Sequence, residues 1–160
     1  MTAVTPCLWF DGVAEEAARF YTSLLPDSRI ERVTHAPADT PSGPAGGVLT
    51  VEFTLGGRPH LALNGGPAFR FTEALSLVIA CEDQAEVDRL WDALTADGGA
   101  PGPCGWCKDR YGLSWQVVPR GLPDMLADPD RARAGRVMRA LLGMSKLDLP
   151  ALHAAAAQPG

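Results

Sequence analysis

Long hydrophobic runs are missing from this 160-residue chain, although 46% of its residues are hydrophobic. No apolar stretch approaches the roughly 20 residues that a membrane-spanning helix needs. The first residues, Met1 to Pro6, also lack the basic start and the apolar core of a secretion signal. We therefore expect a cytoplasmic protein that has no membrane partner.

Positive charge is scarce as well. The chain has 14 lysines and arginines against 19 aspartates and glutamates, which gives a formal net charge of −5 at pH 7. A protein that binds nucleic acid usually carries a basic face, because contacts with phosphates supply much of the affinity. The charge balance therefore argues against a nucleic-acid partner and favours small molecules or other proteins.

Several catalytic signatures are also absent. The glycine pairs match neither the dinucleotide fingerprint nor the phosphate-binding loop, and there is no Gly-x-Ser-x-Gly nucleophile elbow. The three histidines, His35, His60 and His153, are isolated along the chain. No second Cys-x-x-Cys is present to complete a structural zinc site. We therefore expect no metal ion and no other cofactor.

What the sequence does contain is one pattern that occurs twice. Each copy starts with a short apolar strand, continues with an amphipathic helix and ends with further strands. The helices are expected near residues 14–25 and 83–94. The strands are expected at 7–10, 28–34, 49–55 and 59–64 in the first copy, and at 74–80, 104–108 and 113–118 in the second.

The region after Pro119 changes character and is expected to be helical. Asp128-Pro129-Asp130 can open one amphipathic helix, and residues 147–157 can form another. The first of these helices carries four arginines beside acidic neighbours. We interpret them as a solvated helix face rather than as a binding patch.

One predicted hairpin suggests a catalytic pair. A two-residue turn at Gly56 and Gly57 would place Phe53 opposite His60 and mismatch the apolar faces of the two strands, so we expect a longer loop or a bulge there. Glu52 and His60 would then share a polar face. A histidine beside a carboxylate can act as a general base, and a plain cross-strand polar pair is the alternative.

Cys104-Gly105-Trp106-Cys107 has the spacing of a redox dithiol, whose first thiol is activated at a helix N-terminus. The residues that follow predict a turn and a strand, so no helix begins at the motif. The context therefore argues against redox chemistry. A redox function of Cys104 and Cys107 is kept as a third hypothesis.

Several short motifs in combination resemble one family. They are Phe10-Asp11-Gly12, Glu15-Glu16-Ala17, Phe20-Tyr21, Leu63-Asn64-Gly65-Gly66-Pro67, Phe71-Thr72-Glu73, Cys104-Gly105-Trp106, Gly112-Leu113-Ser114-Trp115-Gln116 and Arg136-Val137-Met138. With them the chain resembles the PhnB-like, or demethylubiquinone methyltransferase-like, branch of the vicinal oxygen chelate superfamily. That superfamily also holds glyoxalase I and the bleomycin and fosfomycin resistance proteins.

The resemblance implies an α+β fold in which two paired βαβββ modules curl around a ligand cavity, usually in a homodimer. The modules would cover about residues 1–66 and 72–120 of one domain, 1–120, and residues 121–160 would form a C-terminal helical extension. Metal enzymes of the superfamily hold a divalent ion at positions that correspond to about Pro6, Ser76 and Gln116 here. Pro6 offers no ligand atom and Ser76 is a poor ligand, so we expect no metal at that site.

Methyl transfer, which the name of this branch suggests, lacks support in the sequence. A methyl-donor site normally comes with a nucleotide-type α/β sheet and a glycine-rich turn after the first strand. The sequence predicts neither of them, which argues against that activity.

Alternation along the strands predicts which residues face the cavity. If Gln116 points inward, Ser114 and Val118 do so too, and the same reasoning applies to the other strands. The predicted cavity residues are Leu8, Phe10, Asn64, Ser76, Val78, Ser114, Gln116 and Val118, with Glu52 and His60 as the candidate catalytic pair.

Two main hypotheses follow. The first is a metal-free protein that binds a small organic molecule in this cavity, where a few polar groups interrupt an apolar lining. The second is an isomerase or lyase in which Glu52 and His60 transfer protons near Gln116. The sequence does not name the ligand.

Overall fold

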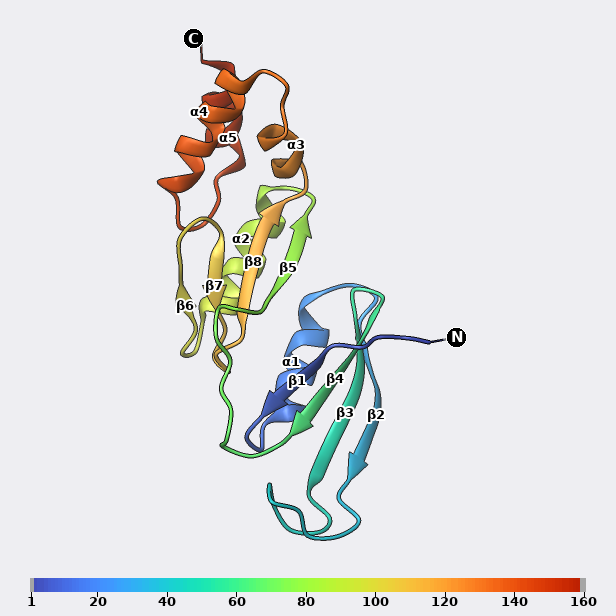
Figure 1. Cartoon of the computed structure of the whole chain (residues 1–160). Helices are drawn as coiled ribbons and strands as arrows, with labels where there is room; N and C mark the ends of the chain where they lie inside the picture. Colours follow the sequence, from blue (N-terminus) through green and yellow to red (C-terminus); the bar gives the residue numbers. More distant parts are fainter. Residues whose placement is uncertain (1, 159–160) are drawn as a thin grey trace. The chain divides into compact units, whose positions relative to one another are not determined.

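The computed structural model describes residues 2–158, which form two compact units (Figure 1). Unit 1 is Met1–Phe71 and unit 2 is Thr72–Gly160. Each unit contains a four-stranded mixed sheet and at least one helix. The fold class is therefore α+β, as the sequence predicts.

Unit 1 is a single βαβββ module. Strand β1 is parallel to β4, and the other neighbouring strands are antiparallel, which gives the order β1-β4-β3-β2. The elements are β1 (Cys7–Phe10), α1 (Ala14–Leu24), β2 (Arg29–His35), β3 (Val48–Leu55) and β4 (Arg58–Asn64).

Unit 2 repeats this arrangement. Its strand order is β5-β8-β7-β6, in which β5 is parallel to β8 and the other neighbours are antiparallel. The order corresponds position by position to that of unit 1, so the predicted repeat is confirmed. The elements are β5 (Ser76–Cys81), α2 (Gln84–Thr95), β6 (Ala100–Pro101), β7 (Trp106–Lys108) and β8 (Ser114–Pro119).

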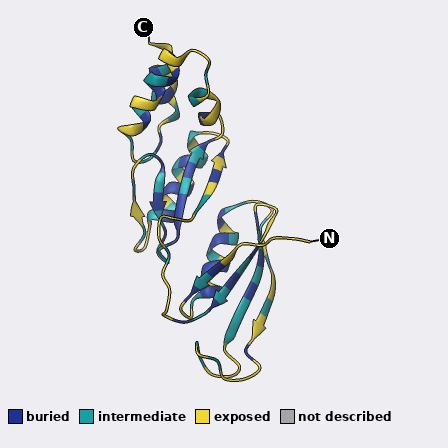
Figure 2. Cartoon of the chain, in the orientation of Figure 1, coloured by how far each residue is buried: buried dark blue, intermediate teal, exposed yellow. Residues whose placement is uncertain are grey.

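In each unit one face of the sheet is buried beneath the first helix (Figure 2). Short helices have little stability of their own in water, so the burial of an apolar stripe holds them in place. Helix α1 buries Ala14, Ala17, Ala18, Tyr21 and Leu24, and α2 buries Val87, Leu90, Trp91 and Leu94. The buried sheet residues include Val51, Phe53 and Leu55 in unit 1 and Ile79, Trp115 and Val117 in unit 2.

The hairpin between β3 and β4 differs from the prediction. Gly56 and Gly57 have φ angles of 54° and 75°, the positive values that a two-residue type I′ turn requires. The register runs without a bulge through the pairs Phe53↔His60 and Leu55↔Arg58. The predicted longer loop or bulge was wrong, because the His60 ring packs on Phe53 and takes a place on the apolar face.

The C-terminal helices belong to unit 2. They are α3 (Leu122–Leu126), α4 (Arg131–Leu142) and α5 (Leu149–Ala157). Asp130 and Asp148 cap the second and third of these helices by accepting hydrogen bonds from backbone N–H groups. Their core consists of Leu122, Val137, Leu141, Leu147 and Leu152, against which Val118 of β8 also packs.

Between residues 2 and 158, no helix combines the length and the apolar character needed to cross a membrane.

Candidate functional site

The face of the unit 2 sheet opposite α2 carries most of the predicted cavity residues. We call this the open face and define it by Ser76, Val78, Trp106, Lys108, Ser114, Gln116 and Val118, the last of which lies at its end and packs against the C-terminal helices. The register brings them together, because Ser76 pairs with Ser114, Val78 and Trp106 flank Gln116, and Lys108 pairs with Ser114 on its other side. The alternation predicted for β5 and β8 is therefore correct.

A hydrogen bond joins the two polar residues at the centre of the open face. The Gln116 Nε2–H group donates to Ser76 Oγ at 2.9 Å. Val78, the direct strand partner of Gln116, is 62% exposed, so an apolar side chain borders this pair at the surface. The open face thus combines hydrogen-bonding groups with an accessible apolar side chain.

Three open-face residues, Trp106, Lys108 and Ser114, line a pocket of about 250 Å³. Its polar wall contains Lys108, Ser114 and Glu73, and its apolar wall contains Trp106 and neighbouring prolines. Lys108 Nζ is 2.5 Å from Glu73 Oε1, and this contact holds the pKa of the Glu73 carboxyl below its ordinary value. Ser114 is only 1% exposed, and its Oγ atom has no hydrogen-bond partner among residues 2–158.

In unit 1 the prediction for β1 was wrong. Leu8 and Phe10, expected in the cavity, are 0% and 3% exposed and pair with Ala62 and Asn64 on the side of the sheet that α1 covers. Trp9 occupies the opposite face. Side chains alternate strictly along a strand, so an error of one residue in phase exchanges the two faces.

The candidate catalytic pair does not share a face of the sheet, although Glu52 and His60 both line one pocket of about 370 Å³. Glu52 lies opposite Leu61, whereas His60 lies opposite Phe53, so the two side chains are on different faces of the sheet. Glu52 forms an ion pair with Arg32. The His60 ring stacks on Phe53 with centroids 5.3 Å apart, and its Nδ1 lies 3.0 Å from the carbonyl oxygen of Arg58. The expectation of a shared polar face is therefore incorrect.

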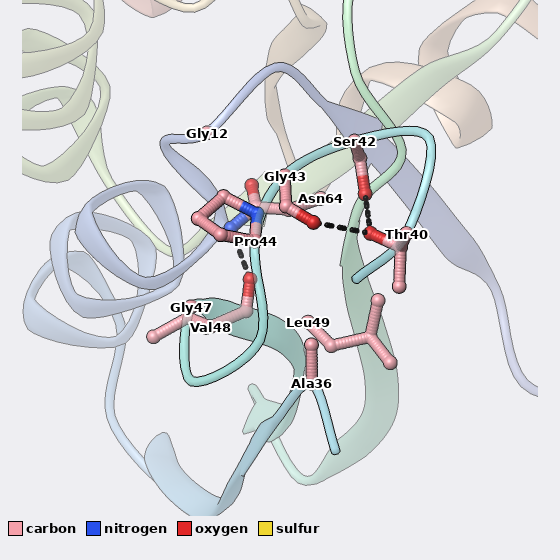
Figure 3. Close-up of a pocket in the computed structure, with 10 residues that line it drawn as sticks. All are labelled: Gly12, Ala36, Thr40, Ser42, Gly43, Pro44, Gly47, Val48, Leu49 and Asn64. Atoms are coloured by element: carbon pink, nitrogen blue, oxygen red, sulfur yellow. Dashed lines mark hydrogen bonds between the residues drawn. The ribbon is translucent and has the colours of Figure 1, made fainter. Parts of the chain in front are cut away.

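Asn64 lines a second pocket of about 250 Å³, within unit 1 (Figure 3). Both ends of its amide are occupied, because Oδ1 accepts from Ala14 N at 2.9 Å and Nδ2 donates to the carbonyl of Val48 at 2.9 Å. The first bond satisfies a free N–H at the start of α1. The figure also shows the hydrogen bonds that tie Thr40 to Ser42 and Gly43. Asn64 is thus mainly a structural link between helix and hairpin.

Comparison with known proteins identifies the family. A family model described as 3-demethylubiquinone-9 3-methyltransferase matches residues 2–118. The chain belongs to this family. A solved structure from Bacillus cereus, described as a 3-demethylubiquinone-9 3-methyltransferase, PhnB protein, is 34% identical to this chain and has a TM-score of 0.65. The match covers 74% of this chain and 99% of the other.

More distant structures share the fold. A glyoxylase/bleomycin resistance protein/dioxygenase domain from Frankia sp. EAN1pec is 18% identical, covers 74% of this chain and 98% of its own, and has a TM-score of 0.51. The fosfomycin resistance protein FosX from Mesorhizobium loti is 16% identical, covers 79% and 98%, and has a TM-score of 0.53. No curated protein matches the chain. This PhnB-like chain therefore has the glyoxalase and bleomycin-resistance fold.

The residues at the superfamily's metal position do not fit a metal ion in this PhnB-like protein. The Pro6 carbonyl already accepts a hydrogen bond from Leu61 N at 2.9 Å. Ser76 and Gln116 are neutral and hydrogen-bonded to each other, whereas zinc sites generally supply three or four strong protein ligands. Within residues 2–158 there is no group of three or more histidine, cysteine, aspartate and glutamate side chains that could hold a metal.

The two cysteines of the Cys-x-x-Cys motif lie in different surroundings. Cys107 is 3% exposed, pairs with Trp115 and faces α2. Burial, and to a smaller extent the Asp109 carboxylate, raise the pKa of Cys107 to about 12. Cys104 precedes β7 in a turn with φ of 55° and packs against the C-terminal helices. A thiol with so high a pKa is a poor nucleophile, so Cys107 is not suited to be the attacking thiol of a redox pair.

Three important residues were not singled out from the sequence. Trp106 and Lys108 lie in or next to the Cys-x-x-Cys motif, which drew attention to the cysteines instead. Alternation along β7, combined with its pairing to β8, would have placed both side chains on the open face. Asp109 is 1% exposed and accepts hydrogen bonds from Trp115 Nε1, Leu113 N and Tyr111 N. The signal for it is an aspartate at the start of a turn that ends in Gly112, where such side chains commonly bond to nearby N–H groups.

Proposed function

We propose that this PhnB-like protein binds a small organic molecule on the open face of unit 2, using side chains alone rather than a metal ion. The observation that carries the proposal is the pocket of about 250 Å³ that Trp106, Lys108 and Ser114 of the open face line. Gln116 and Ser76 do not line it, but they are the strand partners of Trp106 and Ser114. Small-molecule sites typically combine an apolar wall with a few placed polar groups.

The methyl transfer named in the family description is not part of this proposal. A nucleotide-type methyl-donor site is built on a parallel α/β sheet with a glycine-rich turn after the first strand. Both sheets of this chain are mixed, and the turn after β5 is Glu82-Asp83. The alternative is an enzyme in which Glu52 and His60 transfer protons together. It required both side chains on one face of the sheet, and the strand register places them on opposite faces.

The test is a ligand screen by thermal shift, followed by mapping of each hit. A molecule that binds only the native state raises the melting temperature by mass action. The four tryptophans give four indole N–H signals in a ¹H–¹⁵N spectrum, and Trp106→Phe assigns the relevant one. We expect hits to shift the Trp106 signal and to leave that of Trp9, whose indole donates to the Gly66 carbonyl in unit 1, in place.

A matched control is Trp9→Phe, which should leave binding of the hits unchanged. Hits that raise the melting temperature but shift only signals of unit 1 would contradict the proposed site.

We further propose that the protein acts as a homodimer in the cytoplasm, as expected from its sequence and the family it resembles. Light scattering after size-exclusion chromatography should give twice the chain mass. A monomer at micromolar concentration would contradict the homodimer.

A further inference from the structure

Lys108 already holds one anionic group of the chain itself, the carboxylate of Glu73. The Glu73 carboxylate lies 2.5 Å from Lys108 Nζ at the rim of the unit 2 pocket. The two side chains are 43% and 63% exposed. Exposed ion pairs contribute little to stability, since water and salt compete for both charges. An external anion can therefore exchange with Glu73.

The unpartnered hydroxyl of Ser114 is a second and independent sign of a ligand. Ser114 lies directly opposite Lys108 in the β7–β8 register and lines the same pocket. Its Oγ atom is buried without a hydrogen-bond partner among residues 2–158, an arrangement that costs free energy unless another group completes it. Directly opposite side chains have Cβ atoms about 5 Å apart. One carboxylate can therefore contact both residues.

The rest of the pocket is suited to a compact apolar body. Trp106, Pro101 and Pro103 form its apolar wall, and its volume is about 250 Å³. Sites for drug-sized molecules start at about 300 Å³. A ligand with a single ring matches this size, and a planar ring can pack on the Trp106 indole.

We propose that this pocket binds the carboxylate of a small single-ring organic acid, which replaces Glu73 at Lys108 Nζ and accepts a hydrogen bond from Ser114 Oγ. The ring of the acid packs against Trp106. This inference rests on the proposed function and names the chemical class of its ligand. Glu73 acts as an internal competitor, so the site is closed to weak anions.

The test uses three acids and their uncharged counterparts as probes. Benzoate, phenylacetate and cyclohexanecarboxylate are titrated beside the corresponding amides, and the Trp106 indole signal reports binding. We expect at least one acid to bind about tenfold or more tightly than its amide, as a hydrogen bond to a charged group predicts.

Three variants separate the roles of the polar residues. Lys108→Met should weaken binding of that acid about tenfold or more. Glu73→Gln should strengthen it by roughly two- to fivefold, because the competing charge is removed. Ser114→Ala should weaken binding of the acid but should not lower the melting temperature of the free protein. Replacement of a serine with a purely structural role would lower that temperature.

Lys146→Met is the matched control. Lys146 also forms an ion pair, 2.8 Å from Asp88, and its side chain is 38% exposed, but it does not line the pocket. This variant should bind the acid as the wild type does. An equal loss in Lys146→Met and Lys108→Met would show a general charge effect and overturn the inference.

The remaining outcomes distinguish the inference from the proposed function. If amides shift the Trp106 signal as strongly as the acids do, the site binds rings and the carboxylate assignment is wrong. If neither series shifts that signal while other screening hits do, the function stands and the inference fails. If no hit from the screen shifts it either, both fail. Unchanged or weaker binding in Glu73→Gln would overturn the role of Glu73.

Discussion

Asp109 accepts a hydrogen bond of 2.8 Å from the indole Nε1 of Trp115, and both residues are almost fully buried, at 1% exposure each. The same carboxylate accepts from the backbone N–H groups of Tyr111 and Leu113. It therefore fixes the turn between β7 and β8. Because those strands carry Lys108 and Ser114, Asp109 sets the geometry of the proposed site without touching it.

Replacing Asp109 with alanine should cost about 3 kcal/mol of the free energy of unfolding, because buried donors would be left without an acceptor. Asp109→Asn should cost less, since one oxygen acceptor remains. Urea denaturation measures both. The control is Asp92→Ala, whose exposed side chain should change stability by no more than about 0.5 kcal/mol. A similarly small effect of Asp109→Ala would disprove the anchoring role.

Ser114 and Ser145 should respond in opposite ways to the loss of their hydroxyl groups. Ser114→Ala removes a buried hydroxyl that has no partner among the described residues, so it should keep or raise the free energy of unfolding, by up to about 1 kcal/mol. Ser145 Oγ donates to the Gly102 carbonyl at 2.6 Å. Ser145→Ala should therefore cost about 1 kcal/mol. Chemical denaturation compares the two, and a clear loss in Ser114→Ala would mean that its hydroxyl already has a partner in the folded protein.

The ion pair between Lys146 and Asp88 predicts a pH dependence of stability. Two hydrogen bonds hold the pKa of Asp88 below its ordinary value of 3.8. The bond from Lys146 has the larger effect, and the bond from Gln84 has the smaller one. A depressed carboxyl pKa gives stability that is present above the unfolded pKa and is lost as the pH falls through the folded value. Lys146→Met should move the pKa of Asp88 towards its ordinary value, as followed by ¹³C NMR.

The same variant should flatten the decrease of stability at acid pH. Thermal unfolding between about pH 5 and pH 2 compares it with the wild type. An Asp88 titration identical in both proteins would show that Lys146 does not set this pKa.

The cysteines should differ sharply in reactivity. Burial, and to a smaller extent Glu86, raise the pKa of Cys81 to about 12, and Cys107 has a similar value for the same main reason. Iodoacetamide needs an accessible thiol, so the native protein should be labelled at the exposed Cys7, although burial raises the pKa of that thiol as well, and at the half-buried Cys104. Mass spectrometry gives the sites. Rapid labelling of Cys107 would support a redox role. Formation of a disulfide between Cys104 and Cys107 under mild oxidation would do so as well.

Much of the architecture follows from local sequence patterns. The apolar spacing of α1 and α2 and the alternation in β8 depend only on neighbouring residues, so the repeat, the helices and the open face of unit 2 could be predicted. The faces of β1 could not. The phase of β1 depends on its register with β4, and that strand is about fifty residues away. Within such a short strand, Leu8 and Trp9 are equally apolar.

The sequence by itself determined the repeat of strand, helix and further strands, the helical C-terminal region and the alternation that puts Ser114, Gln116 and Val118 on one face of their strand. Only the tertiary structure decided that Glu52 and His60 lie on opposite faces, because both turn glycines adopt positive φ and the ring of His60 stacks on Phe53. It also decided that Ser114 is buried beside the Lys108–Glu73 pair. Burial and the meeting of charges distant in sequence depend on how strands pair, and local spacing does not encode that pairing.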